Sequence, residues 1–95
     1  MQLSVVIPAY NEARSIRKSL LAVNRQVSAK IRGYEIILVD DGSVDGTRAE
    51  AIKAAKNIDD NKIRVFGYDK NAGKGFALRY GASRARGDYL SLIHI

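Results

Sequence analysis

Apolar and polar residues follow one another along this chain in blocks that predict β-strands and α-helices in turn. Short apolar runs of strand length lie at residues 3–8, 34–39 and 63–66, and a fourth begins at residue 89. Glycine, proline, asparagine or aspartate flanks each run, and these residues are typical of turns between strands and helices. The aliphatic run Ile36-Ile37-Leu38-Val39 stops at two aspartates, which predicts a buried strand that ends at a polar edge.

Helices are predicted in the three intervals between these strands. We expect Asn11 to cap the first helix, which runs to about Val27 and has its apolar residues on one face at spacings of four, three and four. That apolar face consists of Ile16, Leu20, Val23 and Val27.

The second and third helices are predicted from capping and turn signals. Thr47-x-x-Glu50 is a capping-box pattern that opens a helix to about Lys56, before a polar turn at residues 57–61. A loop at residues 69–75 precedes the third helix, which is expected to end near residue 86.

The order of these elements predicts an α/β fold. Strands that alternate with helices form an open parallel sheet with right-handed crossovers and with helices on both faces. Ninety-five residues make at most one small domain. The chain stops in or just after the fourth strand, and an edge strand is an unusual end for a domain, so we interpret residues 1–95 as the N-terminal part of a larger one.

Composition excludes several classes of protein. The chain is 46% hydrophobic and 27% charged, which is typical of a globular domain. It has no cysteine and a single histidine, His94, so a disulfide framework and a metal site of several cysteines or histidines are excluded. No basic leader or membrane-length apolar run is visible, and we expect a cytoplasmic location or the cytosolic face of a membrane.

The net charge of +6 raises the question of an anionic partner. Most lysines and arginines fall at solvent positions of the predicted helices, so a solvated surface is the favoured interpretation. Attraction to a phosphate-rich ligand or to anionic lipid headgroups is the alternative. The aromatic residues do not form the stacking platform of a single-strand nucleic-acid binder, and we expect no nucleic-acid partner.

Polar residues that follow the first strand are candidates for ligand binding. Pro8 is expected to end that strand because it cannot donate to the ladder. Tyr10 has a ring suited to stacking on a base, or it covers the sheet edge. Glu12 can accept hydrogen bonds from ribose hydroxyls, or it lies in the first turn of a helix, where the dipole favours a carboxylate.

Further candidates follow the second and third strands. Asp41 can accept the imino N–H of a nucleobase, or it caps neighbouring backbone N–H groups. Asp45 is expected to cap the turn into the second helix. Lys74, in a glycine-rich loop at a helix N-terminus, can face a diphosphate, or it is a solvated lysine. All these residues lie in loops at the edge where parallel α/β sheets bind ligands, which predicts a nucleotide-type site.

Three motifs in the chain resemble those of the family-2 glycosyltransferases, which have the GT-A fold. They are residues 6–12 (Val-Ile-Pro-Ala-Tyr-Asn-Glu), residues 39–47 (Val-Asp-Asp-Gly-Ser-x-Asp-Gly-Thr), and the glycine-rich stretch 71–81 with Arg86-Gly87-Asp88-Tyr89. The third is similar to enzymes that glycosylate dolichyl or polyprenyl phosphates, of glucosyl or mannosyl type. The resemblance implies the strand order 3-2-1-4 and a nucleotide-sugar site formed by Pro8, Ala9, Tyr10, Glu12, Val39 and Asp41.

The resemblance also implies an activity. Such an enzyme transfers a hexose from a UDP- or GDP-sugar to a lipid phosphate with inversion, uses Mg²⁺ or Mn²⁺ held by an Asp-x-Asp motif, and associates with the membrane through later segments. By spacing, the first of these aspartates falls at position 94, where this chain has His94. We therefore expect no metal ligands or catalytic residues in this chain, and no activity from it alone.

Residues 90–95 match the translation of a transposase-adapter sequence used in DNA libraries, and we interpret them as adapter-derived. Two other classes of function stay open at this point. One is a non-catalytic nucleotide-binding module, and the other is a basic interaction protein that binds nucleic acid or an anionic membrane.

Overall fold

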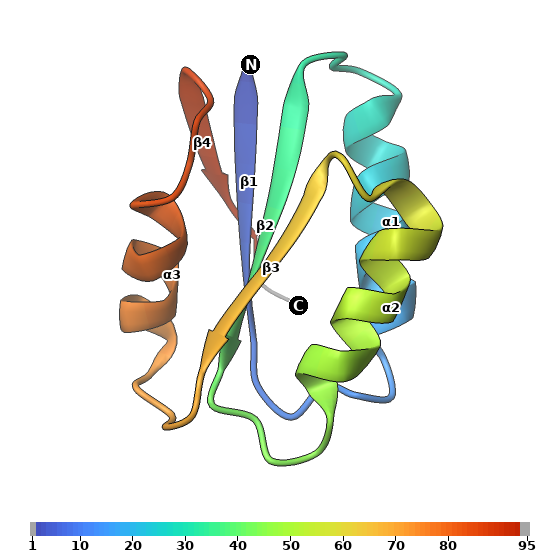
Figure 1. The fold of residues 1–95 in the computed structure, drawn as a ribbon. Helices are drawn as coiled ribbons and strands as arrows, with labels where there is room; N and C mark the ends of the chain where they lie inside the picture. Colours follow the sequence, from blue (N-terminus) through green and yellow to red (C-terminus); the bar gives the residue numbers. More distant parts are fainter. Residues whose placement is uncertain (1, 94–95) are drawn as a thin grey trace.

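The computed structural model describes residues 2–93, which form one four-stranded parallel sheet with three helices (Figure 1). The elements are β1 (Leu3–Ala9), α1 (Ile16–Ser28), β2 (Tyr34–Asp41), α2 (Thr47–Asp59), β3 (Ile63–Tyr68), α3 (Lys74–Ala82) and β4 (Tyr89–Leu92). The strand order is β3-β2-β1-β4, and Leu3 pairs with both Tyr34 and Tyr89. The α/β class, the parallel pairing and the predicted order 3-2-1-4 are confirmed.

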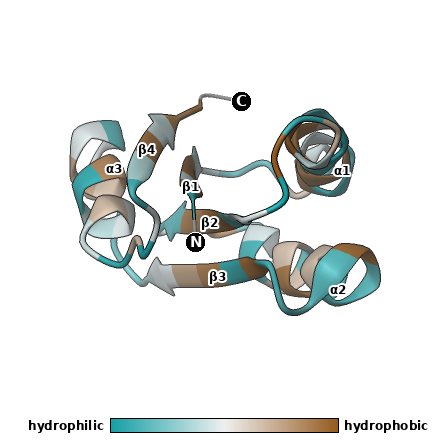
Figure 2. Cartoon of the chain, turned by 90° about the horizontal axis from the view of Figure 1, so that it is seen from above, coloured by the Kyte–Doolittle hydropathy of each residue, from teal (hydrophilic) through white to brown (hydrophobic). Residues whose placement is uncertain are grey.

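Helices cover both faces of the sheet, as predicted (Figure 2). Because side chains alternate along a strand, Val5 and Ile7 of β1 point towards α1 and α2, whereas Val6 points towards α3. Ile16, Leu20 and Val23 bury the predicted face of α1, and Val27 packs against the same cluster. No helix among the described residues is both long and apolar enough to cross a bilayer.

The prediction that Asn11 caps the first helix is wrong. The helix begins at Ile16, after Ser15, and no side chain caps it. Asn11 adopts a left-handed conformation with φ of 51°, and its side-chain oxygen accepts a hydrogen bond from the backbone N–H of Val44. The Asn11 side chain thus bonds to the β2–α2 loop, whereas the local pattern predicts a bond to the N-terminus of a helix.

The capping-box prediction for α2 is also wrong. Thr47 is the first helical residue, and its hydroxyl accepts a hydrogen bond from the backbone N–H of Glu12 instead of capping its own helix. Asp45 accepts a hydrogen bond from the backbone N–H of Thr47 at 3.0 Å, so the capping role predicted for Asp45 is confirmed. The helix runs through the predicted turn to Asp59, since the additional turn packs Ile58 against the core.

Pro8 does not end its strand. Backbone groups of even-numbered residues in β1 face β4, as the hydrogen bond from Ile93 N–H to the Val6 carbonyl shows. The β1–β4 pairing ends at Val6, so the missing N–H of Pro8 interrupts no ladder bond, while Pro8 still pairs in register with Val39.

Other ends of strands and helices differ from the predicted ones because of tertiary contacts. β2 and β3 extend to Asp41 and Tyr68, which pair with each other. The third helix ends at Ala82 rather than near residue 86, because the following turn places the backbone N–H of Arg86 on the Glu35 carboxylate at 2.7 Å. His94, predicted to stand at the metal-ligand position, lies outside the described residues.

Candidate functional site

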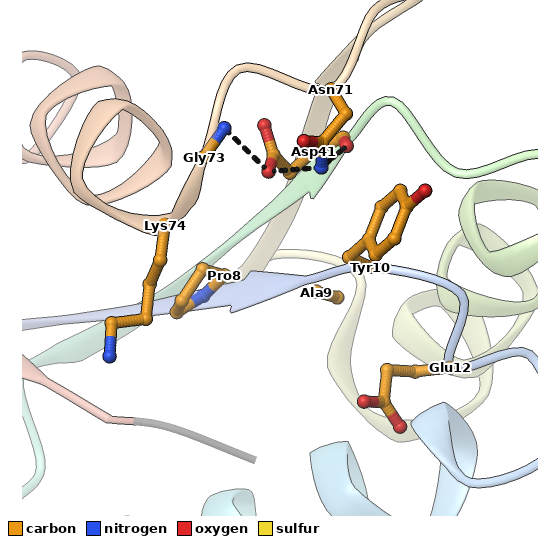
Figure 3. Close-up of a pocket in the computed structure, with 8 residues that line it drawn as sticks. All are labelled: Pro8, Ala9, Tyr10, Glu12, Asp41, Asn71, Gly73 and Lys74. Atoms are coloured by element: carbon orange, nitrogen blue, oxygen red, sulfur yellow. Dashed lines mark hydrogen bonds between the residues drawn. The ribbon is translucent and has the colours of Figure 1, made fainter.

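Three β–α junctions meet at the C-terminal edge of the sheet and enclose a cavity of about 270 Å³ (Figure 3). Six of the seven predicted binding residues line it, together with two residues of the β3–α3 loop. The lining residues are Pro8, Ala9, Tyr10, Glu12, Asp41, Asn71, Gly73 and Lys74. This is the edge at which parallel α/β sheets bind ligands.

The seventh predicted residue, Val39, does not line the cavity. Its side chain is fully buried on the α3 side of the sheet, in a cluster with Val6, Ile37 and Ala77. Because side chains alternate along β2, Val39 and the aspartate two positions later share a face, but only the residue at the strand end reaches the cavity.

The β1–α1 junction supplies the apolar wall and one carboxylate. The Tyr10 side chain is half exposed, with 47% of its area accessible to solvent. Pro8 and Ala9 lie between Glu12 on one side of the cavity and Lys74 on the other (Figure 3). One cavity therefore presents an aromatic ring, a carboxylate and an ammonium group.

Hydrogen bonds between loops hold this junction against the β2–α2 junction. The backbone N–H of Asn11 donates to the Ser43 hydroxyl at 2.8 Å, and that of Ala13 donates to the Asp45 carboxylate at 3.2 Å. The hydrogen bond from Glu12 N–H to Thr47 adds a third tie. The Tyr10–Glu12 segment is thus fixed relative to β2 before any ligand binds.

Asp41 binds four donors of its own chain. One carboxylate oxygen accepts hydrogen bonds from the Tyr68 hydroxyl at 2.7 Å and the Ala72 N–H at 2.9 Å. The other accepts from the Asn71 side-chain amide at 2.8 Å and the Gly73 N–H at 3.1 Å. A carboxylate has about four acceptor positions, so Asp41 is saturated. Asp41 thus accepts hydrogen bonds from backbone N–H groups, as the capping alternative proposed, although these groups belong to Ala72 and Gly73 of the β3–α3 loop.

The same contact affects Tyr68. Burial raises the pKa of the Tyr68 phenol well above its ordinary value, and the hydrogen bond to the Asp41 carboxylate raises it further. The phenol therefore stays protonated at physiological pH and acts as a permanent donor to Asp41.

The neighbouring carboxylate, Asp40, has a separate role. It is 1% exposed, pairs with Arg48 at 3.1 Å and accepts the Ser43 N–H at 3.2 Å. Asp40 does not line the cavity. The two adjacent aspartates, which the sequence presents as a pair, thus lie in different environments.

Gly42 allows the second and third junctions to approach closely. Its φ is +69°, and a Cβ atom built there would overlap the Asn71 backbone nitrogen. Only glycine fits such a contact in a left-handed conformation.

Asn71 and Gly73 line the cavity but were absent from the predicted binding set. They belong to the glycine-rich motif and follow β3, so their position at the same sheet edge was the signal that could have found them. Asn71 and Gly73 reach the cavity because two loops about 30 residues apart in sequence come together, and no local sequence pattern predicts that contact.

The described residues do not fit a divalent metal. No group of three or more histidine, aspartate or glutamate side chains is placed to hold an ion within residues 2–93. Asp40 is paired with Arg48, and the acceptor positions of Asp41 are filled. Neither carboxylate offers the free oxygen that Mg²⁺ or Mn²⁺ requires.

Sequence comparison assigns the chain to a family. Residues 4–94 match the family described as Glycosyl transferase family 2. The chain belongs to this family. The resemblance drawn from the three motifs is thereby confirmed.

Curated members of glycosyl transferase family 2 include similar chains. The human dolichyl-phosphate beta-glucosyltransferase is 39% identical over 92 residues, which cover 92% of this chain and 28% of that protein. The undecaprenyl-phosphate 4-deoxy-4-formamido-L-arabinose transferase of Proteus mirabilis is 38% identical over 87 residues, which cover 92% of this chain and 26% of that protein. This chain thus spans little more than a quarter of the length of either relative.

Solved structures agree with the fold. The mannosyltransferase PcManGT from Pyrobaculum calidifontis, in complex with GDP-Man and Mn²⁺, superposes with a TM-score of 0.81 at 28% identity. The match covers 94% of this chain and 26% of that one. The predicted assignment to the GT-A fold of glycosyltransferases is confirmed.

Proposed function

We propose that this chain forms the donor-nucleoside site of a glycosyltransferase that transfers a hexose from a UDP- or GDP-sugar to a dolichyl or polyprenyl phosphate. The observation that carries the proposal is the single cavity at the C-terminal edge of the sheet, to which three separate junctions contribute. The dolichyl- and undecaprenyl-phosphate relatives support the acceptor class, and the GDP-Man complex supports the donor class.

The cavity chemistry suits the parts of a nucleoside diphosphate. The half-exposed Tyr10 ring offers a stacking surface for the base. Glu12 can accept hydrogen bonds from ribose hydroxyls, and Lys74, at the start of α3, can face the diphosphate. At about 270 Å³ the cavity is at the small end of ligand sites, which run from roughly 300 Å³, and this suits a nucleoside rather than a whole sugar donor.

Asp41 can read the base only by exchanging one of its four donors. Asn71 is the donor that can leave most easily, because it is an exposed side chain whose amide can be hydrated once displaced. The backbone donors of Ala72 and Gly73 are fixed by the loop. An imino N–H of the base would then replace the Asn71 amide on the carboxylate.

The chain's contribution to transfer is binding and orientation. In the reaction an oxygen of the acceptor phosphate attacks the anomeric carbon of the sugar, and the bond from that carbon to the diphosphate oxygen breaks with inversion. Residues that hold the nucleoside fix the direction of the leaving diphosphate, and such positioning lowers the barrier. We place the divalent metal and the catalytic base outside the described residues, and the whole enzyme at the cytosolic face of a membrane.

Titration of the chain with UDP and GDP, followed by isothermal calorimetry, tests the proposal. We expect measurable binding of one nucleotide and a loss of roughly 5- to 100-fold in affinity for Tyr10→Ala, because stacking on an aromatic ring contributes about 1–3 kcal/mol per base. Tyr89→Ala is the matched control, since Tyr89 is 70% exposed on β4 and lies away from the cavity.

Equal affinities of the Tyr10→Ala and Tyr89→Ala variants would contradict the assignment of the cavity. Absence of binding to both nucleotides, together with salt-dependent binding to DNA, would favour the nucleic-acid alternative instead.

A further inference from the structure

The whole net positive charge of the chain lies in one segment, residues 13–33. Between Glu12 and Glu35 there are six basic residues and no acidic one, while the ten other basic residues equal the ten acidic residues in number. The six residues, here called the basic face, are Arg14, Arg17, Lys18, Arg25, Lys30 and Arg32.

Three of these residues lie in α1, one lies in the turn before it and two lie in the segment that follows it. Lys18 and Arg25, seven positions apart, share the side of α1 opposite the buried Ile16 and Leu20, and Arg14 stands in the turn two residues before the helix. All six are exposed, and none of their side chains makes a hydrogen bond or ion pair with any residue in the range 2–93. Helix α1 lies beside α2 on one face of the sheet, and no other helix or strand of the described residues lies over its outer side (Figure 2).

The positive charges at the start of α1 destabilise this helix. Arg17 and Lys18 lie in the first turn of α1, which has no acidic residue, and the positive end of the helix dipole disfavours cations there. Arg14, in the turn just before the helix, adds a third positive charge near this end. A surface that served only for solubility would mix charges of both signs, as the remainder of this chain does.

We propose that the basic face docks on an anionic lipid bilayer. Lysine and arginine clusters are attracted to anionic headgroups, and these six cations are exposed and have no ion-pair partner within residues 2–93. Residues 13–33 contain no aromatic side chain, so the stacking that favours single-stranded nucleic acid is missing. The choice of a bilayer rests on the proposed function, because a polyprenyl-phosphate acceptor is held in a membrane.

The position of the face suits this role. Arg14 is two residues from Glu12, which lines the donor cavity, so the N-terminal end of the basic face lies near the cavity. Docking there brings the lipid surface and the nucleotide site together.

Co-sedimentation of the 95-residue chain with vesicles tests the proposal. We expect binding to vesicles of phosphatidylcholine mixed with phosphatidylglycerol, no binding to phosphatidylcholine alone, and a steep fall in binding as salt rises. Equal binding to both kinds of vesicle, or to neither, would overturn the proposal.

A pair of charge-matched variants locates the contact. The first carries Arg14→Gln, Arg17→Gln, Lys18→Gln and Arg25→Gln. The second removes four exposed cations elsewhere, with Lys53→Gln, Lys56→Gln, Lys70→Gln and Arg79→Gln. Each cation near an anionic surface adds roughly fivefold to affinity, so we expect a loss on the order of 100-fold or more for the first variant and only a few-fold for the second.

Equal losses in the two variants would show that net charge alone drives binding and would overturn the proposal. The proposal would also be overturned if the basic face bound single-stranded RNA and the chain showed no preference for anionic vesicles.

Nucleotide titration of both variants separates this proposal from the proposed function. If the first variant keeps its nucleotide affinity and loses vesicle binding, both proposals are supported. If the unmodified chain binds vesicles but no nucleotide, only the proposed function is overturned.

Discussion

At the residue scale, Asp41 decides how the candidate site is built. Its carboxylate gathers donors from Tyr68, Asn71, Ala72 and Gly73, and so connects the end of β2 to the loop that follows β3. Hydrogen bonds to a charged group contribute more than neutral ones, typically about 1.5–3 kcal/mol. The residue that we propose to contact the base is therefore also the residue that holds the wall of the cavity.

Asp41→Asn is expected to lower the free energy of unfolding by about 2–3 kcal/mol. The new amide group would face two of these donors, the Asn71 side-chain amide and the Gly73 N–H, and those charge-assisted hydrogen bonds would be lost. Urea denaturation measures the change. Asp69→Asn is the control, because Asp69 is exposed and its side chain makes no hydrogen bond among the described residues, and we expect it to change stability by less than about 0.5 kcal/mol. Equal stabilities of the two variants would contradict this account of Asp41.

At the scale of elements, the fit between β2–α2 and β3–α3 depends on the absence of one side chain. Gly42 has a positive φ and lies against the backbone of Lys70 and Asn71. Gly46, four residues later, also has a positive φ, but a Cβ atom there would meet nothing within 4 Å. A side chain at Gly46 would therefore cause backbone strain alone, whereas one at Gly42 would cause both backbone strain and a steric clash.

Gly42→Ala is expected to destabilise the chain more than Gly46→Ala. Both substitutions force a left-handed conformation, at about 1–2 kcal/mol, but only the first also pushes two loop backbones apart. We expect Gly42→Ala to cost at least about 1 kcal/mol more in urea denaturation and to weaken nucleotide binding, since the cavity wall moves. Identical losses for the two variants would mean that the loops separate without cost.

At the scale of the whole molecule, a buried polar network ties the sheet together at the edge opposite the cavity. Glu35 of β2 is 2% exposed, accepts a hydrogen bond from Ser4 of β1 at 2.6 Å and pairs with Arg64 of β3 at 2.6 Å. The backbone N–H of Arg86 also donates to it. Burial by itself would raise the pKa of Glu35, but the hydrogen bonds from Ser4, Arg86 and Arg64 outweigh burial and hold the pKa below its ordinary value.

This network predicts acid sensitivity. Because the pKa of Glu35 is lower in the folded than in the unfolded chain, its stabilising effect is complete above the ordinary value of about 4.3 and is lost as pH falls below it. We expect the free energy of unfolding to fall more between neutral and acidic pH in the unmodified chain than in Glu35→Gln. Urea denaturation at several pH values measures both curves. If stability depended on pH in the same way in both proteins, Glu35 would not be the source of the acid sensitivity.

Glu35→Gln should also lower stability at neutral pH by about 2–3 kcal/mol. The substitution leaves the Arg64 guanidinium, 24% exposed, without its partner. Arg64→Gln is the companion variant, and a similar loss from either substitution would identify the pair as the source.

The sequence by itself determined the class and the order of the elements. Continuous aliphatic runs, a helical spacing in residues 16–27 and turn residues between them require a parallel sheet with helices on both faces, because right-handed crossovers allow few other solutions. The same pattern placed Tyr10, Glu12, Asp41 and Lys74 at one sheet edge, since parallel strands all end there.

Only the tertiary structure decided what each polar side chain does. Asn11 and Thr47 have local capping patterns, yet they bond to each other's junctions, because contacts between loops satisfied donors that local caps would otherwise have served. Val39 fell outside the cavity and Asn71 inside it for a similar reason. Local sequence fixes the periodicity of each element, whereas the partners of a loop residue depend on loops 30 residues away, which meet only after the sheet has formed.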